Sequence, residues 1–251
     1  MIRIHKIRKR VIRIYEVTGL AMLVERCRKP RHRNSVFIWI PKSAGTSVYE
    51  MLGAPPLLKT EHLIRSRFAN KDLVTFGHVD YGQLLRENYV SSEFDRTAYK
   101  FAFCRNPYAR MVSLYFYSQR VGRLSTEISF LEFCRQLADQ SCEPIGLYNS
   151  EGLSQCNPQC CWLEGFDVDF VGRVESLQRD LAVVMGELGL DAKSEVPQLN
   201  STSHRKHQDY YCRESRELVE RLYADDFAAF GYHKDLDRTS SDGTGIGRKA
   251  A

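Results

Sequence analysis

The residues with the clearest chemical meaning form a short polar loop within VFIWIPKSAGTS, residues 36–47. An apolar run of strand type ends at Pro41, and a helix-compatible segment follows the loop. The loop consists of Lys42, Ser43, Ala44, Gly45, Thr46 and Ser47. Backbone N–H groups of such a loop converge on an anion, helped by the positive end of the next helix. The pattern predicts a site that grips a phosphate-bearing molecule.

Each residue type in this loop suits that task. Gly45 permits close backbone approach, and Lys42 supplies a full positive charge. The hydroxyls of Thr46 and Ser47 can cap the helix or bind phosphate oxygens. The loop does not fit the Walker A motif, G-x-x-x-x-G-K-[ST], because its lysine precedes the glycine and no second glycine stands upstream. A nucleotide kinase or NTPase with a degenerate loop stays an alternative, as does an inactive binding module.

Strands and helices alternate along the chain and must position this loop. Apolar runs predict strands over residues 36–40, 72–79, 99–105 and 168–174. Amphipathic spacing and capping residues predict helices over 46–53, 106–120, 129–139, 175–190 and 213–232. Asn106 is the expected cap of the second helix, with Pro107 at its first position. The alternation predicts an α/β fold with a central parallel sheet flanked by helices.

Two blocks in this order resemble the donor-binding blocks of sulfotransferases that use 3′-phosphoadenosine 5′-phosphosulfate (PAPS), in particular the carbohydrate sulfotransferase branch. The loop PKSAGTS resembles their 5′-phosphosulfate loop, and FAFCRNPYARMVSLYF (101–116) resembles their 3′-phosphate block, with Arg105 and Ser113 at the binding positions. The resemblance extends over residues 36–232 through TFGHVDYG (75–82), NPQCCWL (157–163), VDFVGRVESLQRDL (168–181), LNSTSHRKHQDYY (199–211) and AAFGY (228–232).

The resemblance implies a P-loop-like three-layer fold that binds PAPS and moves its sulfuryl group to a hydroxyl of a carbohydrate or glycoconjugate. It implies that residues 43–47 hold the 5′-phosphate and that Arg105 with Ser113 holds the 3′-phosphate. Lys42 would neutralise charge on the departing oxygen. Arg205 is expected to cover a phosphate, with a solvated polar loop as the alternative. No metal is expected, because lysine and backbone dipoles supply the positive field.

A base must remove the proton of the acceptor hydroxyl, and His78 is the first candidate. Histidine titrates near neutral pH, and His78 ends a predicted strand where ligands bind to open α/β sheets. It also matches the family's Gly-His position, which is the base in some members. Asp80 would orient His78 or contact the acceptor, and Glu61 or His62 would replace His78 as base. Gln159 is a candidate acceptor contact; Trp162 lines the same site or belongs to the core.

Charge divides the chain into three parts. Residues 1–33 carry 11 Lys and Arg against 2 Glu, whereas the remaining residues carry 25 against 29 Asp and Glu. We therefore expect a basic leader or helix over 1–34, a sulfotransferase domain over 35–236 and a disordered tail over 237–251. The leader suits peripheral contact with an anionic membrane, binding of a partner, or packing on the domain. No nucleic-acid partner is expected.

Cysteine usage and hydropathy bear on the compartment. The eight cysteines are scattered, which favours free thiols; Cys142, Cys156, Cys160 and Cys161 leave a local disulfide or metal site open. The apolar stretch 17–24 is too short to span a bilayer. We expect a cytoplasmic protein, with a membrane-associated or Golgi-luminal enzyme as the alternative.

Overall fold

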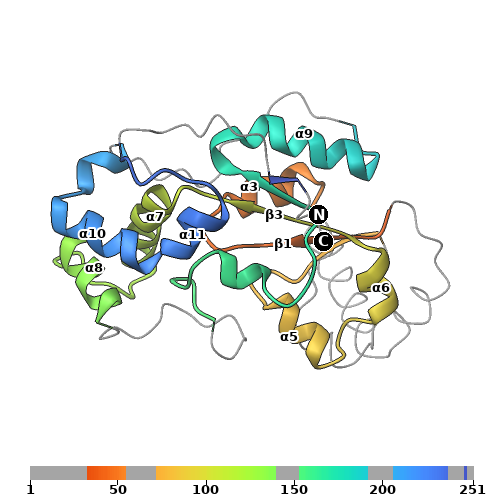
Figure 1. The fold of residues 1–251 in the computed structure, drawn as a ribbon, viewed down its shortest axis with the longest axis horizontal. Helices are drawn as coiled ribbons and strands as arrows, with labels where there is room; N and C mark the ends of the chain where they lie inside the picture. The colour runs from red at the N-terminus through yellow and green to blue at the C-terminus, as the bar shows by residue number, and fades with distance from the viewer. Residues whose placement is uncertain (1–32, 55–71, 140–152, 192–205, 237–245, 248–251) are drawn as a thin grey trace, which may run out of the picture.

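A five-stranded sheet with helices packed around it forms the centre of the fold (Figure 1). The computed structural model describes residues 33–54, 72–139, 153–191, 206–236 and 246–247. The strands are β1 (Ser35–Ile38), β2 (Leu73–Thr75), β3 (Tyr99–Cys104), β4 (Phe170–Arg173) and β5 (Ile246–Gly247). Their order is β2-β1-β3-β4-β5, and every pair is parallel except β4 with β5. The predicted α/β fold with a central parallel sheet is confirmed.

Helices cover both faces of the sheet and extend beyond its carboxyl edge. The α-helices are α3 (Gly45–Met51), α5 (Tyr81–Arg86), α6 (Ser92–Thr97), α7 (Pro107–Arg120), α8 (Phe130–Ala138), α9 (Leu177–Leu188), α10 (Arg213–Leu222) and α11 (Ala224–Ala229). Short 3-10 helices lie at Cys160–Leu163 (η1), Val174–Ser176 (η2) and His207–Tyr210 (η3). Figure 1 shows α3 and α9 on one side of the sheet, α5 and α6 on the other, and α7, α8, α10 and α11 together at one end.

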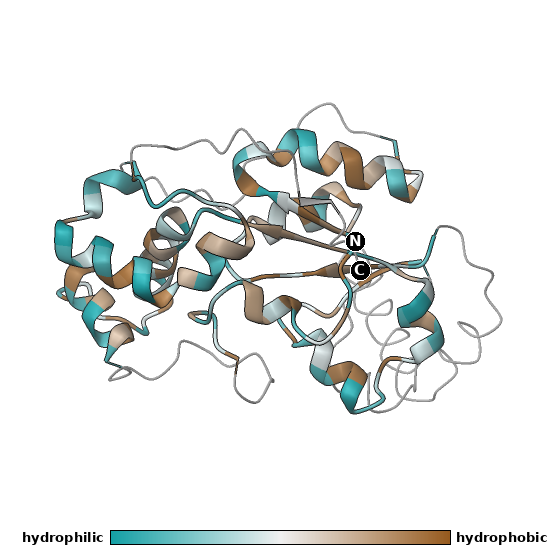
Figure 2. Cartoon of the chain, viewed as in Figure 1, coloured by the Kyte–Doolittle hydropathy of each residue, from teal (hydrophilic) through white to brown (hydrophobic). Residues whose placement is uncertain are grey.

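Side-chain alternation along the strands explains these layers. Successive strand residues point to opposite faces, so Phe37 and Phe101 pack with the residues of α3 and α9, whereas Val36 and Ile38 pack with those of α5 and α6. Figure 2 shows apolar residues along β1 and β3, between helices whose outer surfaces are polar. The sheet is buried on both faces, which is typical of parallel strands.

The start of α7 follows its sequence signals closely. The Asn106 side chain accepts hydrogen bonds from the N–H groups of Tyr108 and Ala109, and Pro107 occupies the first helical position. These contacts satisfy backbone donors that have no partner within the helix. The predicted cap and helix are confirmed, and they fix Arg105 at the exit of β3.

Other boundaries differ from the predictions. The helix predicted over 213–232 is two helices, because the backbone of Tyr223 has a φ of −117°, outside the helical range. The Tyr223 side chain is buried at this break. The segment 81–97 contains α5 and α6, which no pattern of helical length had indicated. Within the tail that was expected to be disordered, Ile246 and Gly247 pair with the otherwise open edge of β4, which corrects that expectation for these two residues.

Candidate functional site

The loop after β1 has an unusual backbone that the sheet topology places at a ligand-binding position. Lys42 and Ala44 both adopt left-handed conformations, with φ of 65° and 55°. Each costs roughly 1–2 kcal/mol in a residue with a Cβ, and such strain clusters at functional sites. The strand that follows β1 in the chain, β2, lies on one side of it, and the next strand, β3, lies on the other, so the strand order reverses at β1. Such switch points are where open α/β sheets bind ligands.

Glycine is required at one position of this loop. A Cβ added to Gly45 would lie 1.8 Å from Nε1 of Trp39, because the indole packs against the first turn of α3. Trp39 in turn stacks on Tyr49, with ring centroids 5.4 Å apart. Ala44, at the N-cap of α3, makes no side-chain cap hydrogen bond. Thr46 and Ser47 lie within the first turn of the helix, so neither has the capping position that the sequence allowed.

Arg105 leaves the carboxyl end of β3 beside this loop. Its Nη1 lies 3.5 Å from the backbone oxygen of Lys42, at the limit of a hydrogen bond. Burial lowers the pKa of Arg105, and the Glu175 carboxylate opposes that shift. The same carboxylate accepts a hydrogen bond from the N–H of Asn106. The two motifs that suggested a donor site therefore meet in one place, although 63 residues separate them in the sequence.

One face of α7 adds further positive charge. Arg110, Ser113, Tyr117 and Arg120 are three or four residues apart and so lie along one side of the helix. Nζ of Lys42 lies 4.2 Å from the centroid of the Tyr117 ring, and the guanidinium of Arg120 is 5.5 Å from the same ring. Lys42, the face of α7 and the end of β3 thus form one cationic cluster.

The charges in this cluster act on one another. Burial and the charges of Arg120, Arg105 and Arg110 lower the pKa of Lys42 from 10.5 to about 8. An excess of buried positive charge favours a multiply charged anion, which would compensate it. Arg110, Tyr117 and Arg120 were not among the residues predicted for the site. Their spacing from Ser113 along the predicted helix was the signal that could have identified them.

His78 reaches the same region from β2. Gly77, with φ of 63°, turns the chain after Phe76, so that His78 lies over the end of β1. Its Nδ1 is 2.8 Å from the backbone oxygen of Trp39. A carbonyl oxygen only accepts, so Nδ1 carries the proton and Nε2 is the unprotonated nitrogen of the neutral ring. Burial, partly opposed by the Trp39 hydrogen bond, and the charge of Lys42 lower the pKa of His78 to about 4.

Two other candidates have contacts that favour structural roles. Asp80 pairs with Arg86, with 3.2 Å between the carboxylate and guanidinium, and precedes α5. Trp162 is fully buried in the core between the sheet and α5, 6.4 Å from the His78 ring between centroids. Of the two interpretations left open for Trp162, the structure supports the core.

Gln159 is enclosed by protein, which argues against the predicted acceptor contact. Its side chain is 0% exposed, and Oε1 accepts hydrogen bonds from the Ser43 hydroxyl and the Arg105 N–H, each at 2.9 Å. Its Nε2 donates to the Arg105 carbonyl and to Asp226. These bonds use the whole capacity of the amide. We therefore replace the acceptor role with a structural one.

Several predicted residues lie outside the described part of the chain. These are the alternative bases Glu61 and His62, and Arg205 with the rest of the segment expected to cover the nucleotide. Cys142 of the cysteine cluster is also outside it, whereas Cys156, Cys160 and Cys161 are free thiols. Ligand atoms of Cys160, Cys161 and Glu164 lie within 4.8 Å of one another, the only such metal-compatible group among the described residues.

Comparisons with known proteins agree with this arrangement. Residues 27–233 match the sequence profile of the sulfotransferase family. Carbohydrate sulfotransferase 12 of Xenopus laevis is 26% identical over an alignment of 179 residues, and the match covers 56% of this chain and 41% of that protein. The same enzyme of Mus musculus is 29% identical over an alignment of 116 residues, and the match covers 43% of this chain and 26% of that protein. The chain thus spans less than half the length of these curated relatives.

The fold has a solved counterpart. The crystal structure of mouse sulfotransferase SULT7A1 complexed with PAP (3′-phosphoadenosine 5′-phosphate) superimposes with a TM-score of 0.52 at 14% identity and covers 83% of this chain and 90% of that one. This likeness supports the P-loop-like three-layer fold. Among the described residues, no helix has the length and apolar character that a membrane span requires. On the match over residues 27–233, which is most of its length, the chain belongs to the sulfotransferase family.

Proposed function

We propose that this protein transfers the sulfuryl group of PAPS to a hydroxyl group of a carbohydrate or glycoconjugate. The observation that carries the proposal is the convergence of Lys42 and Arg105, 63 residues apart, at the switch point of the sheet. Burial and the neighbouring cations lower the pKa of Lys42, as expected where several positive charges lie close together. That charge suits a donor with phosphate groups at both ends of its ribose.

The residues of the site divide the work of binding. Backbone N–H groups of residues 43–47 would hold the 5′-phosphate, and Arg105 with Ser113 would hold the 3′-phosphate. PAPS supplies an activated sulfuryl group with a good leaving group, so the protein must mainly position and stabilise charge. Lys42 would neutralise the negative charge that develops on the oxygen that leaves. The ammonium group of Lys42 lies over the Tyr117 ring, a cation–π contact that restricts where this charge lies.

His78 is suited to accept the proton of the acceptor hydroxyl. Its Nδ1 proton is held by the Trp39 carbonyl, so in the neutral ring Nε2 is the nitrogen that can accept a proton. With a pKa of about 4, the ring is neutral at neutral pH, which is the form a base needs. The charge of Lys42 contributes to that low pKa, and a bound anion would oppose this contribution and make His78 a stronger base.

A carbohydrate acceptor is supported by the relatives alone. Both curated relatives are named carbohydrate sulfotransferases, and both match over only part of their length. A screen of labelled donor against sugar, lipid and phenol acceptors would test the acceptor class directly. Transfer to phenols or lipids, with none to sugars, would contradict this part of the proposal and leave the donor assignment standing.

Ligand-induced stabilisation tests the donor assignment. A ligand present at a hundredfold excess over its Kd stabilises the folded state by about 2.7 kcal/mol. We expect PAP to raise Tm by about 5–10 °C and ATP with magnesium to leave it unchanged. Stabilisation by ATP with magnesium alone would favour a kinase or NTPase. Binding of PAP without transfer to any acceptor would favour an inactive binding module.

A conservative variant tests the base. In His78→Asn, the side-chain amide can still donate to the Trp39 carbonyl, but it has no group equivalent to Nε2. We expect kcat to fall by about 10²–10⁴-fold while PAP stabilises the variant as it does the parent. A variant with full activity would transfer the role to Glu61 or His62.

A further inference from the structure

We propose that Gln159 is a positioning residue that, held by Asp226, locks the two phosphate-binding segments of the donor site in one fixed relation. The inference rests on the proposed donor site and adds the device that aligns its two halves. Gln159 itself touches neither the donor nor the acceptor. It acts through Ser43 in the loop after β1 and through Arg105 at the end of β3.

The hydrogen bonds of Gln159 join the two segments directly. Ser43, in the first segment, donates its hydroxyl to Oε1 at 2.9 Å. Arg105, in the second, donates its N–H to the same oxygen at 2.9 Å and accepts from Nε2 at 2.8 Å. Ser43 is 1% exposed and Gln159 is 0% exposed, so water does not compete for these groups.

Gln159 takes the place of a neighbouring strand at Arg105. The pairing of β3 with β1 ends at Ala102, and its pairing with β4 ends at Cys104. The N–H and C=O of Arg105 would then need other partners, because unpaired buried backbone groups are costly. One side-chain amide satisfies both groups, as a peptide group of an adjacent strand would do. The direction in which β3 leaves the sheet is thereby fixed.

Asp226 holds the amide in its orientation. Its Oδ2 accepts from Nε2 of Gln159 at 3.2 Å, and its Oδ1 accepts from the N–H of Cys160 at 2.9 Å. Asp226 is 0% exposed and lies on α11, next to Phe227 in the core. The Asp226 carboxylate can only accept, so the side of the Gln159 amide that faces it must be Nε2. A rotation of the amide by 180° would place Oε1 against the carboxylate and break these bonds. Position 226 therefore determines which side of the amide meets Ser43.

Loss of this link should affect one class of ligand more than another. With leucine at position 159, the Ser43 hydroxyl and both backbone groups of Arg105 lose their partner, and the two segments move independently. A ligand with phosphates at both ends gains from prealigned segments, whereas a ligand with one phosphate does not. A loss of overall stability would instead reduce the folded fraction of the protein, and the apparent affinity for both ligands would fall by the same factor.

The experiment compares Gln159→Leu with a matched control, Gln136→Leu on α8, at a half-buried position outside the donor site. Isothermal titration calorimetry, well below each Tm, measures Kd for adenosine 3′,5′-bisphosphate and for adenosine 5′-monophosphate. We expect Gln159→Leu to weaken bisphosphate binding about tenfold or more and monophosphate binding less than about threefold. The KM for PAPS should rise with the bisphosphate Kd, and Gln136→Leu should match the parent in every measurement.

A reciprocal exchange keeps the test informative if Gln159→Leu does not fold. Gln159→Glu alone sets two buried carboxyl groups against each other, and we expect it to lose bisphosphate binding. In Gln159→Glu with Asp226→Asn, the amide at position 226 can donate to the carboxylate, and part of the affinity should return. No recovery in the double variant would overturn the proposal.

The outcomes separate this proposal from the function on which it rests. If Gln159→Leu loses affinity equally for both ligands, or for neither, the positioning role is overturned. The donor site itself still stands in that case, provided that the parent protein binds the bisphosphate. A parent protein that binds neither ligand would overturn the proposed function and this inference with it.

Discussion

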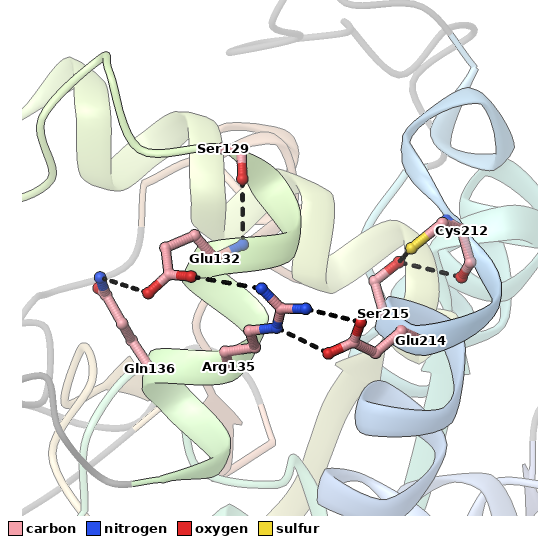
Figure 3. Close-up of polar contacts among 7 residues, drawn as sticks. All are labelled: Ser129, Glu132, Arg135, Gln136, Cys212, Glu214 and Ser215. Atoms are coloured by element: carbon pink, nitrogen blue, oxygen red, sulfur yellow. Dashed lines mark hydrogen bonds and ion pairs between the residues drawn. The ribbon is translucent and has the colours of Figure 1, made fainter.

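Two polar networks in this protein have similar bond lengths and opposite surroundings. At the donor site, Gln159 joins Ser43, Arg105 and Asp226 through bonds of 2.8–3.2 Å, and its side chain is fully buried. Between α8 and α10, Arg135 makes two bonds of 2.7 Å to Glu214 (Figure 3), and both side chains are about half exposed. The surface pair carries full charges and has the shorter bonds.

We infer from this comparison that burial, more than bond length, determines how much each network contributes to stability. Water and salt weaken the attraction between Arg135 and Glu214, and two long side chains lose freedom when they pair. At the donor site no water replaces a lost partner, so each broken bond leaves a buried polar group unsatisfied. Figure 3 shows that the surface network joins side chains of α8, among them Arg135, to Glu214 and its neighbours at the start of α10. We therefore expect substitutions in the buried network to reduce stability much more than substitutions in the surface network.

The largest effect should come from the buried arginine beside the donor site. Arg110 is 1% exposed and donates to the backbone oxygens of Pro41, Gln155 and Asn157. Arg110→Met leaves these carbonyl groups without a partner, and we expect a loss of about 3 kcal/mol in the free energy of unfolding. Urea denaturation would measure it. Arg135→Met is the matched control, and equal losses in the two variants would contradict the comparison.

The helix caps offer a second contrast between the two regions. Asn106 caps α7 next to Arg105, is 6% exposed, and accepts two backbone N–H bonds. Ser129 caps α8 at the surface and accepts one, from Glu132. We expect Asn106→Ala to cost about 2 kcal/mol and Ser129→Ala about 1 kcal/mol or less, because water can replace the exposed cap. A larger loss for Ser129→Ala in chemical denaturation would reverse our ranking.

These contrasts also mark what the sequence alone could predict. The four parallel strands, the Asn106 cap and the meeting of Lys42 and Arg105 at one site were predicted, because each depends on local pattern and on the topology of parallel strands. The end of β2 was not: the strand predicted over 72–79 spans only Leu73–Thr75. The role of Gln159 was not, because its partner Ser43 lies 116 residues away and no local pattern specifies that contact. The cation–π contact of Lys42 with Tyr117 joins a loop to a distant helix in the same way.

Missed boundaries have a similar physical reason. The helical pattern over 213–232 continues through Tyr223, and only tertiary packing reveals the break, since its hydroxyl bonds to the Cys156 carbonyl in the buried core. The 6-residue helices α5 and α6 are too short to establish a periodic pattern. Packing on the sheet stabilises them, and intrinsic propensity contributes little at that length.

The pH dependence of activity should distinguish the cationic cluster from the surface pair. Lys42, with a pKa of about 8, must stay charged, and His78, with a pKa of about 4, must be neutral. In the free enzyme, kcat/KM for the donor should therefore rise through about pH 4 and fall through about pH 8. Beyond each limb the change is about tenfold per pH unit.

Variants assign the two limbs. Lys42→Arg should remove the alkaline limb, because a guanidinium stays charged far above that range, even if the rate is lower overall. His78→Asn should remove the acid limb. An alkaline limb that persists in Lys42→Arg would show that another group titrates there. Arg135→Ala should leave both limbs in place.

The smallest effect should come from the surface pair itself. We expect Arg135→Ala and Glu214→Ala each to change Tm by only about 1 °C, because exposed ion pairs contribute little even with two short hydrogen bonds. In about 1 M salt the difference from the parent should vanish, since the Debye length is then only about 3 Å. A Tm loss that matches Arg110→Met, or that persists in salt, would mean that this pair organises α8 and α10. In that case bond geometry would outweigh burial, and the ranking of the two networks would have to be reversed.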